Sequence, residues 1–146
     1  LRGDATTLAQ EFALLEAYLA LMQLRMGERL QVRLDLPAEL RDVALPPLLA
    51  QPLVENAIHH GLEPKIEGGT VTVRARESEG RLHLEVADDG QGLDGPRRRG
   101  GHGVALENIR ARLAARYGAS ASLELLPREG GGTRALIQFP LAHLKP

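Results

Sequence analysis

The stretch LPPLLAQPLVENAIHHG, residues 45–61, predicts a helix with one apolar side and a polar margin. Its apolar residues return every three to four positions, as on one face of an α-helix that turns every 3.6 residues. These residues are Leu49, Ala50, Leu53, Val54, Ala57 and Ile58. Asn56, His59 and His60 lie at the edge of this face because they are three and four residues apart. We therefore expect a core helix that carries a polar ledge formed by these three residues.

Two features of the same stretch limit the prediction. Pro46 and Pro47 suit the first turn of a helix, whereas Pro52 predicts either a kink or a second helix start. Glu55 points about 100° away from Asn56 on an ideal helix, so it is not assigned to the ledge. Taken alone, the ledge is more typical of a capping asparagine beside two surface histidines than of a ligand site.

The composition excludes several classes of function. The 146 residues suffice for one domain with its own core, and the absence of cysteine removes disulfides, thiol nucleophiles and thiolate metal sites. The 18 Lys and Arg residues balance 19 Asp and Glu residues, and only 3% of the residues are aromatic, so no nucleic-acid partner is expected. The lack of cysteine also fits an intracellular setting. No apolar run is long enough to span a membrane and no signal-peptide pattern is recognisable, so the chain is expected to be soluble.

A first helix of about twenty residues is predicted from a threonine cap at Thr6 or Thr7 to a stop at Gly27. Its apolar residues are spaced by alternating fours and threes, which is a heptad seam. The seam consists of Leu8, Phe12, Leu15, Leu19, Met22 and Met26. Two arrangements satisfy this seam: the helix docks on the rest of the domain, or it is the remaining half of a dimerising bundle.

Alternating apolar and polar residues predict five strands. The first covers residues 28–36 and ends at a proline. Residues 70–77 and 81–88 are separated by a short turn and form an antiparallel hairpin, with His83 on its polar face in a structural or exposed position. Two closing strands follow: residues 121–126 and 133–141, joined by a glycine-rich turn.

The hairpin ends in Asp88-Asp89-Gly90-Gln91-Gly92, which places a carboxylate acceptor at a rigid strand end beside two glycines. These glycines permit positive φ and let a ligand approach the backbone. Residues 94–103, DGPRRRGGHG, have no hydrophobic periodicity and are expected to form a mobile loop. Its three arginines are either a solvated charge cluster or a lid that closes on an anion.

A helix is predicted over residues 104–117, directly after this loop. Glycines before a helix N-terminus leave several N–H groups free along a favourable dipole, which suits phosphate. Asn108, Arg110 and Arg112 on this helix are candidates to assist phosphate binding, although surface salt bridges are the more typical role for the two arginines.

The order of these elements resembles the ATP-binding fold shared by DNA gyrase, heat-shock chaperones, MutL and the histidine kinases, known as the GHKL, HATPase_c or Bergerat fold. The closest resemblance is to the LytS-type sensor histidine kinases, whose catalytic domain reads L-Q-P-L-V-E-N-A-I-K-H-G where this chain has AQPLVENAIHHG. The stretches EAYLALMQLRMGERL and GVALENIRARLAARYG resemble that family too, so the similarity covers essentially the whole chain.

The resemblance implies an α+β fold: a two-layer α/β sandwich whose mixed, mostly antiparallel sheet is covered on one face by helices and preceded by one N-terminal helix. It implies that residues 1–28 are the C-terminal helix of the dimerisation and phosphoacceptor region. Residues 29–146 are then the ATP-binding catalytic domain.

A nucleotide site with ATP and Mg²⁺ as cofactors is also implied by the resemblance. Asn56 would coordinate Mg²⁺ that bridges the ATP phosphates, and Asp88 would accept a hydrogen bond from the adenine amino group. The other implied nucleotide-binding residues are His59, His60, Gly90, Gly92, Gly101, Gly103, Val104 and Thr133. His59 stands where the family usually has Lys, which predicts a pH-dependent nucleotide affinity. Ala105 replaces another usual Gly, so the end of the loop is expected to be stiffer.

The implied reaction is transfer of the γ-phosphoryl group to a histidine outside this chain. In the hydrolysing relatives a Glu lies four residues before the Mg²⁺ asparagine, and Pro52 occupies that position here, so attack by water lacks a base. The family's acceptor motif P-H-F-L-x-N is absent, so no catalytic residue is assigned and these residues are not expected to phosphorylate themselves.

The implied partners are the phosphoacceptor helix of the same sensor kinase, a response regulator and a second copy bound through residues 8–26. The module is expected to be cytoplasmic within a membrane-anchored protein, touching the membrane only through segments outside these residues. Two alternatives of the same fold stay open. One is a nucleotide-gated conformational module of the chaperone or mismatch-repair kind, and the other is a serine kinase that acts on an anti-sigma partner.

Overall fold

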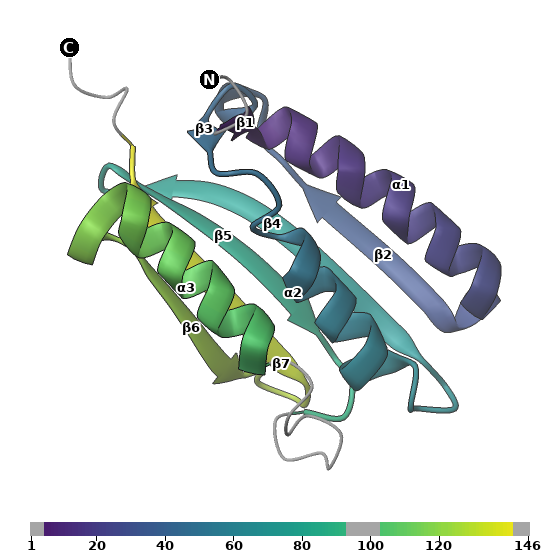
Figure 1. Cartoon of the computed structure of the whole chain (residues 1–146). Coiled ribbons are helices and arrows are strands. Elements are labelled where there is room, and N and C mark those ends of the chain that lie inside the picture. The colour runs from purple at the N-terminus through teal and green to yellow at the C-terminus, as the bar shows by residue number, and fades with distance from the viewer. Residues whose placement is uncertain (1–4, 93–102, 142–146) are drawn as a thin grey trace.

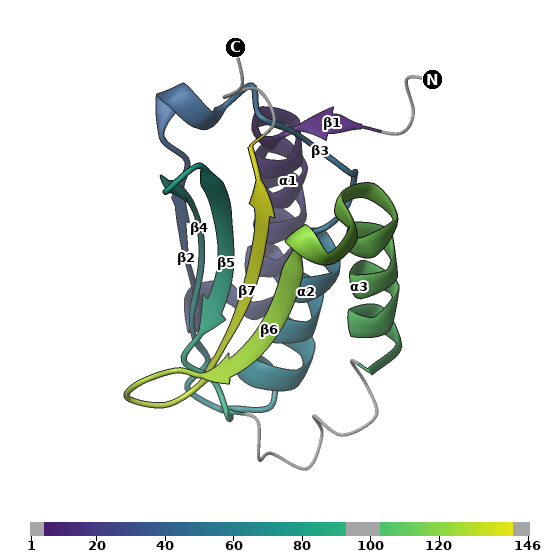
Figure 2. The same ribbon diagram turned by 90° about the vertical axis from the view of Figure 1, so that its left-hand side faces the viewer.

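Within the residues that the structure describes, 5–92 and 103–141, five strands form one mixed sheet and three α-helices cover one of its faces (Figures 1 and 2). In this computed structural model the strand order is β2-β4-β5-β7-β6. The strands are β2 (Leu30–Asp35), β4 (Gly69–Ser78), β5 (Arg81–Asp88), β6 (Ser122–Pro127) and β7 (Thr133–Pro140). Neighbouring strands are antiparallel except β2 and β4, which are parallel. The expected two-layer α+β sandwich is confirmed.

The α-helices are α1 (Leu8–Met26), α2 (Gln51–Asn56) and α3 (Gly103–Tyr117). Two short strands, β1 (Thr6–Thr7) and β3 (Ala44–Leu45), pair beside the start of α1. Single 3₁₀ turns lie at Gly27–Arg29, Ala38–Leu40 and Gly118–Ser120. No helix in the described part of the chain combines the length and apolarity needed to cross a bilayer.

Helix α1 is predicted correctly and docks on the sheet. Thr7 is its N-cap, with a capping box in which the Thr7 hydroxyl accepts from the Gln10 amide and the Gln10 side chain accepts from the Thr7 amide. Gly27 ends it at φ 64°. All six seam residues are buried in the core that α1 shares with the sheet.

The burial of the seam corrects one expectation about dimerisation. The residues from Leu8 to Met26 that form the heptad seam are covered by this chain itself, so a second copy cannot bind through them. The apolar residues that α1 exposes lie on its other side and are Leu14, Leu21 and Leu24. The division of the chain at residue 28 stays a prediction, because α1 and the sheet share one core in this structure.

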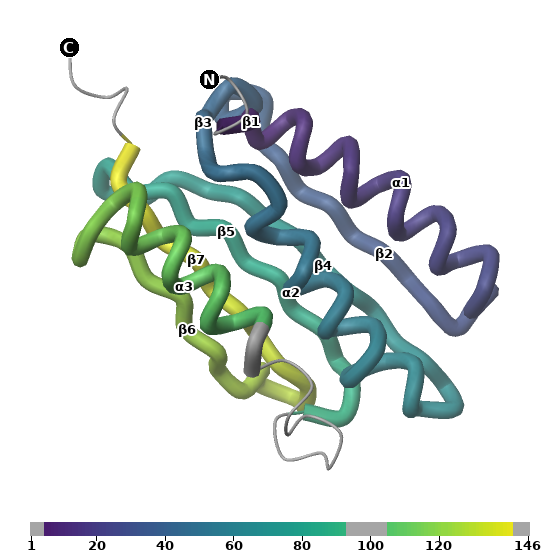
Figure 3. Tube along the Cα trace, in the orientation of Figure 1, coloured from purple at the N-terminus to yellow at the C-terminus, as the bar shows by residue number. Residues whose placement is uncertain are grey.

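The helix predicted from Pro46 begins later and changes its winding. Leu48 has a φ of 58°, which a right-handed helix does not allow, and α2 starts at Gln51 with Pro52 in its first turn. Pro52 therefore marks the second helix start that the sequence offered as one of two outcomes. After Asn56 the helix widens into a π-helix, η4 (Ala57–Leu62), and the two run as one continuous winding between α1 and α3 (Figure 3).

The sheet contains the predicted hairpin and one arrangement that the sequence did not predict. Strands β4 and β5 pair antiparallel from Val71 with Asp88 to Ser78 with Arg81. The two closing strands also pair, but β7 lies between β6 and β5, so the start of β7 meets the end of β5. This insertion places Thr133 directly opposite Asp88.

Candidate functional site

Three predicted residues meet at one end of the sheet. Asn56 comes from the last turn of α2, Asp88 from the end of β5 and Thr133 from the start of β7. They line one small cavity of about 20 Å³, which is room for roughly one water molecule. The other residues around it are apolar: Leu53, Ala57, Val86, Leu106, Leu125 and Ala135. A few polar groups among apolar walls are the lining typical of a small-molecule site, although such sites usually enclose about 300–1,000 Å³.

Asp88 is the buried acceptor of this cluster. Its side chain belongs to a residue that is only 4% exposed, and its Oδ1 accepts a hydrogen bond from the Gly90 amide at 2.8 Å. Such a bond to the backbone two residues later holds an aspartate in a fixed direction at a turn. The structure thus provides a rigid carboxylate at the strand end, as the sequence predicted.

Thr133 contributes a polar atom that lacks a partner. The residue is 3% exposed, and its Oγ1 is buried without a hydrogen-bond partner among the described residues. Leaving a buried hydroxyl unpaired costs about 1–3 kcal/mol, so such atoms call for an explanation. A ligand that donates to Asp88 and bonds to Thr133 would pair both groups, and an adenine ring offers both bonds. The ring is larger than the cavity, so its entry requires the cavity to widen.

Gly90 is required for the packing of the protein's own backbone, whatever its predicted role toward a ligand. A Cβ at this position would lie 2.1 Å from the Gly61 carbonyl oxygen, so the glycine lets the end of η4 approach the turn. The Gln91 amide donates to the same oxygen at 3.0 Å, and the Gln91 side chain donates to the His60 carbonyl at 2.7 Å. The close approach at Gly90 is therefore to the protein's own backbone. Gly92 has a φ of 86°, and a Cβ there would lie 3.8 Å from the Gly132 carbonyl oxygen, which is an ordinary van der Waals contact.

Gly132 was missed by the sequence analysis. A Cβ there would lie 1.9 Å from the Asp88 carbonyl oxygen, and its φ is 104°. The signal was present as the G-G-G-T run that leads into Thr133. Only the pairing of β7 with β5 shows which backbone this glycine must accommodate.

The two histidines of the predicted ledge do not join the cavity. His59 is exposed, and its Nδ1 lies 3.0 Å from Glu63 Oε1. Glu63 also pairs with Arg25 of α1 at 3.0 Å, so His59 turns toward α1. His59 and His60 line a separate surface hollow with Glu63. The structure gives no support to a pH-dependent affinity that acts through His59.

Asn56 is the side chain best placed to hold a metal ion here. Glu55 points elsewhere, as predicted: its Oε2 accepts from Gln51 at 3.3 Å, and burial together with this carboxylate raises the pKa of Tyr18 on α1. No group of three or more His, Asp or Glu side chains that could hold a metal occurs in the described ranges. A single oxygen ligand still fits Mg²⁺, which keeps several waters and binds substrate phosphates.

The expected phosphate-binding part of the site is only partly described. Gly103 and Val104 open helix α3. Gly101 and the arginine-rich loop predicted as a lid lie outside the described residues. The salt bridges predicted for Arg110 and Arg112 do not occur among the described residues. Both side chains donate to the backbone carbonyls of other segments.

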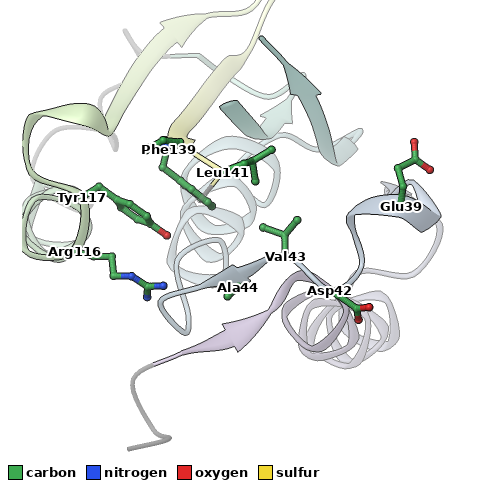
Figure 4. Close-up of a pocket in the computed structure, with 9 residues that line it drawn as sticks. Glu39, Asp42, Val43, Ala44, Arg116, Tyr117, Phe139 and Leu141 are labelled. Atoms are coloured by element: carbon green, nitrogen blue, oxygen red, sulfur yellow. The ribbon is translucent and has the colours of Figure 1, made fainter. Parts of the chain in front are cut away.

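A larger cavity lies at the other end of the same layer (Figure 4). It has a volume of about 560 Å³, and Tyr117 and Phe139 stack in its wall with ring centroids 4.7 Å apart. Glu39 and Asp42 lie on one side of it and Arg116 on another. Because β7 carries Thr133 at one end and Phe139 near the other, the two cavities are about 20 Å apart. None of the predicted site residues lines this second cavity.

Taken together, the helix layer on a mixed sheet and the buried strand-end carboxylate beside an asparagine define an ATP-binding domain of the GHKL fold. The chain belongs to the family of histidine kinase-, DNA gyrase B- and HSP90-like ATPases, whose family model matches residues 45–143. Family membership confirms the resemblance found in the sequence and implies the use of ATP.

Within this family, the chain is similar to sensor histidine kinases. The chain is 32% identical to the sensor histidine kinase YesM of Bacillus subtilis over 96% of its own length and 25% of that protein. It is 33% identical to the sensor protein LytS of Enterococcus faecalis over 91% of its length and 24% of that protein. The chain thus spans about a quarter of these curated relatives. The catalytic domain of histidine kinase ThkA has the same fold, with a TM-score of 0.71 at 14% identity, over 94% of this chain and 96% of that domain.

Proposed function

We propose that this chain is the ATP-binding catalytic module of a sensor histidine kinase. It transfers the γ-phosphoryl group of ATP to a histidine outside these residues, for onward transfer to an aspartate of a response regulator. The observation that carries the proposal is the meeting of Asn56, Asp88 and Thr133 at one cavity. The names of the relatives, sensor histidine kinase and sensor protein, support the same assignment.

Each of the three residues has a role that its chemistry suits. Asp88 accepts a hydrogen bond from the adenine amino group, and the Thr133 hydroxyl bonds to the same ring or to a water beside it. Asn56 would supply one oxygen ligand to Mg²⁺, and the bound ion would supply positive charge next to the phosphates. The N–H groups at the start of α3, from Gly103 and Val104, bind phosphate along the helix dipole.

The neighbourhood of Asn56 favours phosphoryl transfer to a side chain over hydrolysis. Pro52 lies four residues before Asn56 and carries no base. Glu55 is directed to Gln51 and toward Tyr18 of α1, so it does not line the cavity. A water molecule near the γ-phosphate would therefore lack a carboxylate base from α2.

Further partners follow from the same proposal. The phosphoacceptor helix of the parent kinase must reach the γ-phosphoryl group from outside this chain. A second copy, if it binds α1, uses the exposed Leu14, Leu21 and Leu24 rather than the buried seam. We assign the module to the cytoplasmic side of the cell, where its ATP is available.

Calorimetric titration with ATP, with and without Mg²⁺, tests the proposal. We expect Asp88→Asn to weaken ATP binding at least about tenfold, because it replaces a charged acceptor in a buried site. Asn56→Ala should leave binding nearly independent of Mg²⁺. Asp42→Asn is the matched control, since Asp42 is exposed and lies at the far cavity. Absence of ATP binding by the unmutated chain would refute the proposal.

A further inference from the structure

The segment between β3 and α2 is held by a buried carboxylate from α1. Glu11 is 1% exposed; its Oε1 accepts from the Leu48 amide at 3.0 Å and its Oε2 from the Ala50 amide at 2.9 Å. Ala50 is the N-cap of α2. Leu48 is one of two non-glycine residues with positive φ in the described ranges, so this turn is strained and depends on its contacts. Both oxygens of one side chain therefore fix the start of α2.

The same segment is held from the opposite side by α3. The Arg112 guanidinium donates to the Leu48 carbonyl at 3.2 Å and also to the Pro47 carbonyl. The amide groups of this turn thus bond to α1, and its carbonyl groups bond to α3. The backbone of residues 47–50, which leads into α2, is therefore hydrogen-bonded to both α1 and α3, the helices on either side of α2 (Figure 1).

The geometry links this connection to the nucleotide site. Asn56 lies six residues after Ala50, which is about 9 Å along the helix axis. A tilt of α2 by about 10° around its start would move Asn56 by about 1.5 Å, and misplacements of this size can cost two orders of magnitude in catalysis. Leu106 of α3 lines the same cavity as Asn56, so the position of α3 relative to α2 also matters.

We propose that Glu11 and Arg112 are positioning residues that set α2 against α3, and thereby place Asn56 for the metal-bound phosphates. This inference rests on the proposed function. The carboxylate suits the role because it accepts two amide hydrogen bonds at once, near the positive end of the α2 dipole. Arg112 suits it because its planar guanidinium donates to two neighbouring carbonyls at once.

The test measures ATP affinity in the presence of Mg²⁺ and in the presence of a chelator. We call the first affinity divided by the second the magnesium ratio. Asp88 and Thr133 belong to the sheet, so binding without Mg²⁺ reports on the adenine end and on the integrity of the fold. We expect Glu11→Gln and Arg112→Met each to lower the magnesium ratio about tenfold, while affinity without Mg²⁺ changes by less than about twofold. The double variant should lose little more than either single one, because both act on one segment.

Two matched controls separate positioning from a general loss of charge. Arg110→Met removes a guanidinium from the same helix, but Arg110 donates to the Leu123 carbonyl of β6 and not to the segment before α2. Glu124→Gln neutralises an exposed carboxylate on β6. Both should keep the magnesium ratio of the unmutated chain.

The outcomes distinguish the inference from the proposed function. If the unmutated chain shows a magnesium ratio above one and both folded variants keep it, the positioning role is refuted and the proposed function stands. If the unmutated chain binds no ATP, the proposed function itself fails. Should Glu11→Gln not fold, Arg112→Met decides alone, because Arg112 is only partly buried and its loss leaves the core intact.

Discussion

Replacing Thr133 by Val should stabilise the protein without nucleotide and weaken nucleotide binding. Thr133→Val exchanges the unpaired Oγ1 for a methyl group of nearly the same size, in a residue that is 3% exposed. Because a buried unpaired hydroxyl costs about 1–3 kcal/mol, we expect the free energy of unfolding to rise by about 1 kcal/mol. If the hydroxyl bonds to the bound nucleotide, losing that bond weakens ATP binding by about 1.4 kcal/mol, which is about tenfold.

Urea unfolding with and without ATP measures both effects. At an ATP concentration of 100 times the Kd of the unmutated chain, binding adds about 2.7 kcal/mol to that chain and about 1.4 kcal/mol to the variant. The variant should therefore be the more stable protein without ATP and should lose this advantage when ATP is present. Thr72→Val on the outer face of β4 is the control, with no change in the effect of ATP. A variant that is less stable without ATP and binds it normally would show that the hydroxyl is paired within the protein and does not touch the ligand.

Three further predictions concern the packing and charge of the fold. Gly90→Ala should lower the free energy of unfolding by at least about 2 kcal/mol in urea titrations, because its Cβ would lie 2.1 Å from the Gly61 oxygen; unchanged stability would contradict the packing described. Leu15→Glu should unfold the chain because Leu15 is fully buried. Leu21→Glu should leave the chain folded because Leu21 is exposed, and in gel filtration it should elute later than the unmutated chain if a dimer forms through the exposed face of α1. Burial lowers the pKa of His83 below 6.5, so the unfolded chain binds more protons and stability should fall as the pH drops through 6.5. His83→Gln should flatten this slope between pH 5 and 7.5 in urea titrations, and an unchanged slope would assign it to other groups.

Elements defined by near neighbours could be predicted from the amino-acid sequence. The β4–β5 hairpin follows from alternation within residues 70–88 and a two-residue turn, and α1 follows from its heptad spacing, its Thr7 cap and its Gly27 stop. The buried acceptor Asp88 was predicted because a strand end and two glycines stand next to it in the chain. In each case the interactions that form the structure join residues only a few positions apart, so the local pattern contains them.

The heptad seam shows where this reasoning ends. A period of 3.5 residues predicts that one face of α1 is buried, but it does not distinguish burial against the sheet of the same chain from burial against a second helix. The seam is covered by the sheet of the same chain. The sequence pattern did not predict that Glu11 is buried beside the seam. Glu11 lies three residues after Leu8 and four before Leu15, on the apolar face, where a carboxylate needs partners.

Other features were decided only by contacts between distant parts of the chain. Thr133 meets Asp88 because β7 inserts beside β5, and the Glu11 oxygens bond to amides 37 and 39 residues away. The turn of His59 away from the cavity depends on Glu63, on Arg25 of α1 and on the π-helix, which changes the direction of each side chain after Asn56. Pairings of this kind are selected by the packing of the whole core, because many partners are compatible with each local sequence and only the assembled fold satisfies all of them at once.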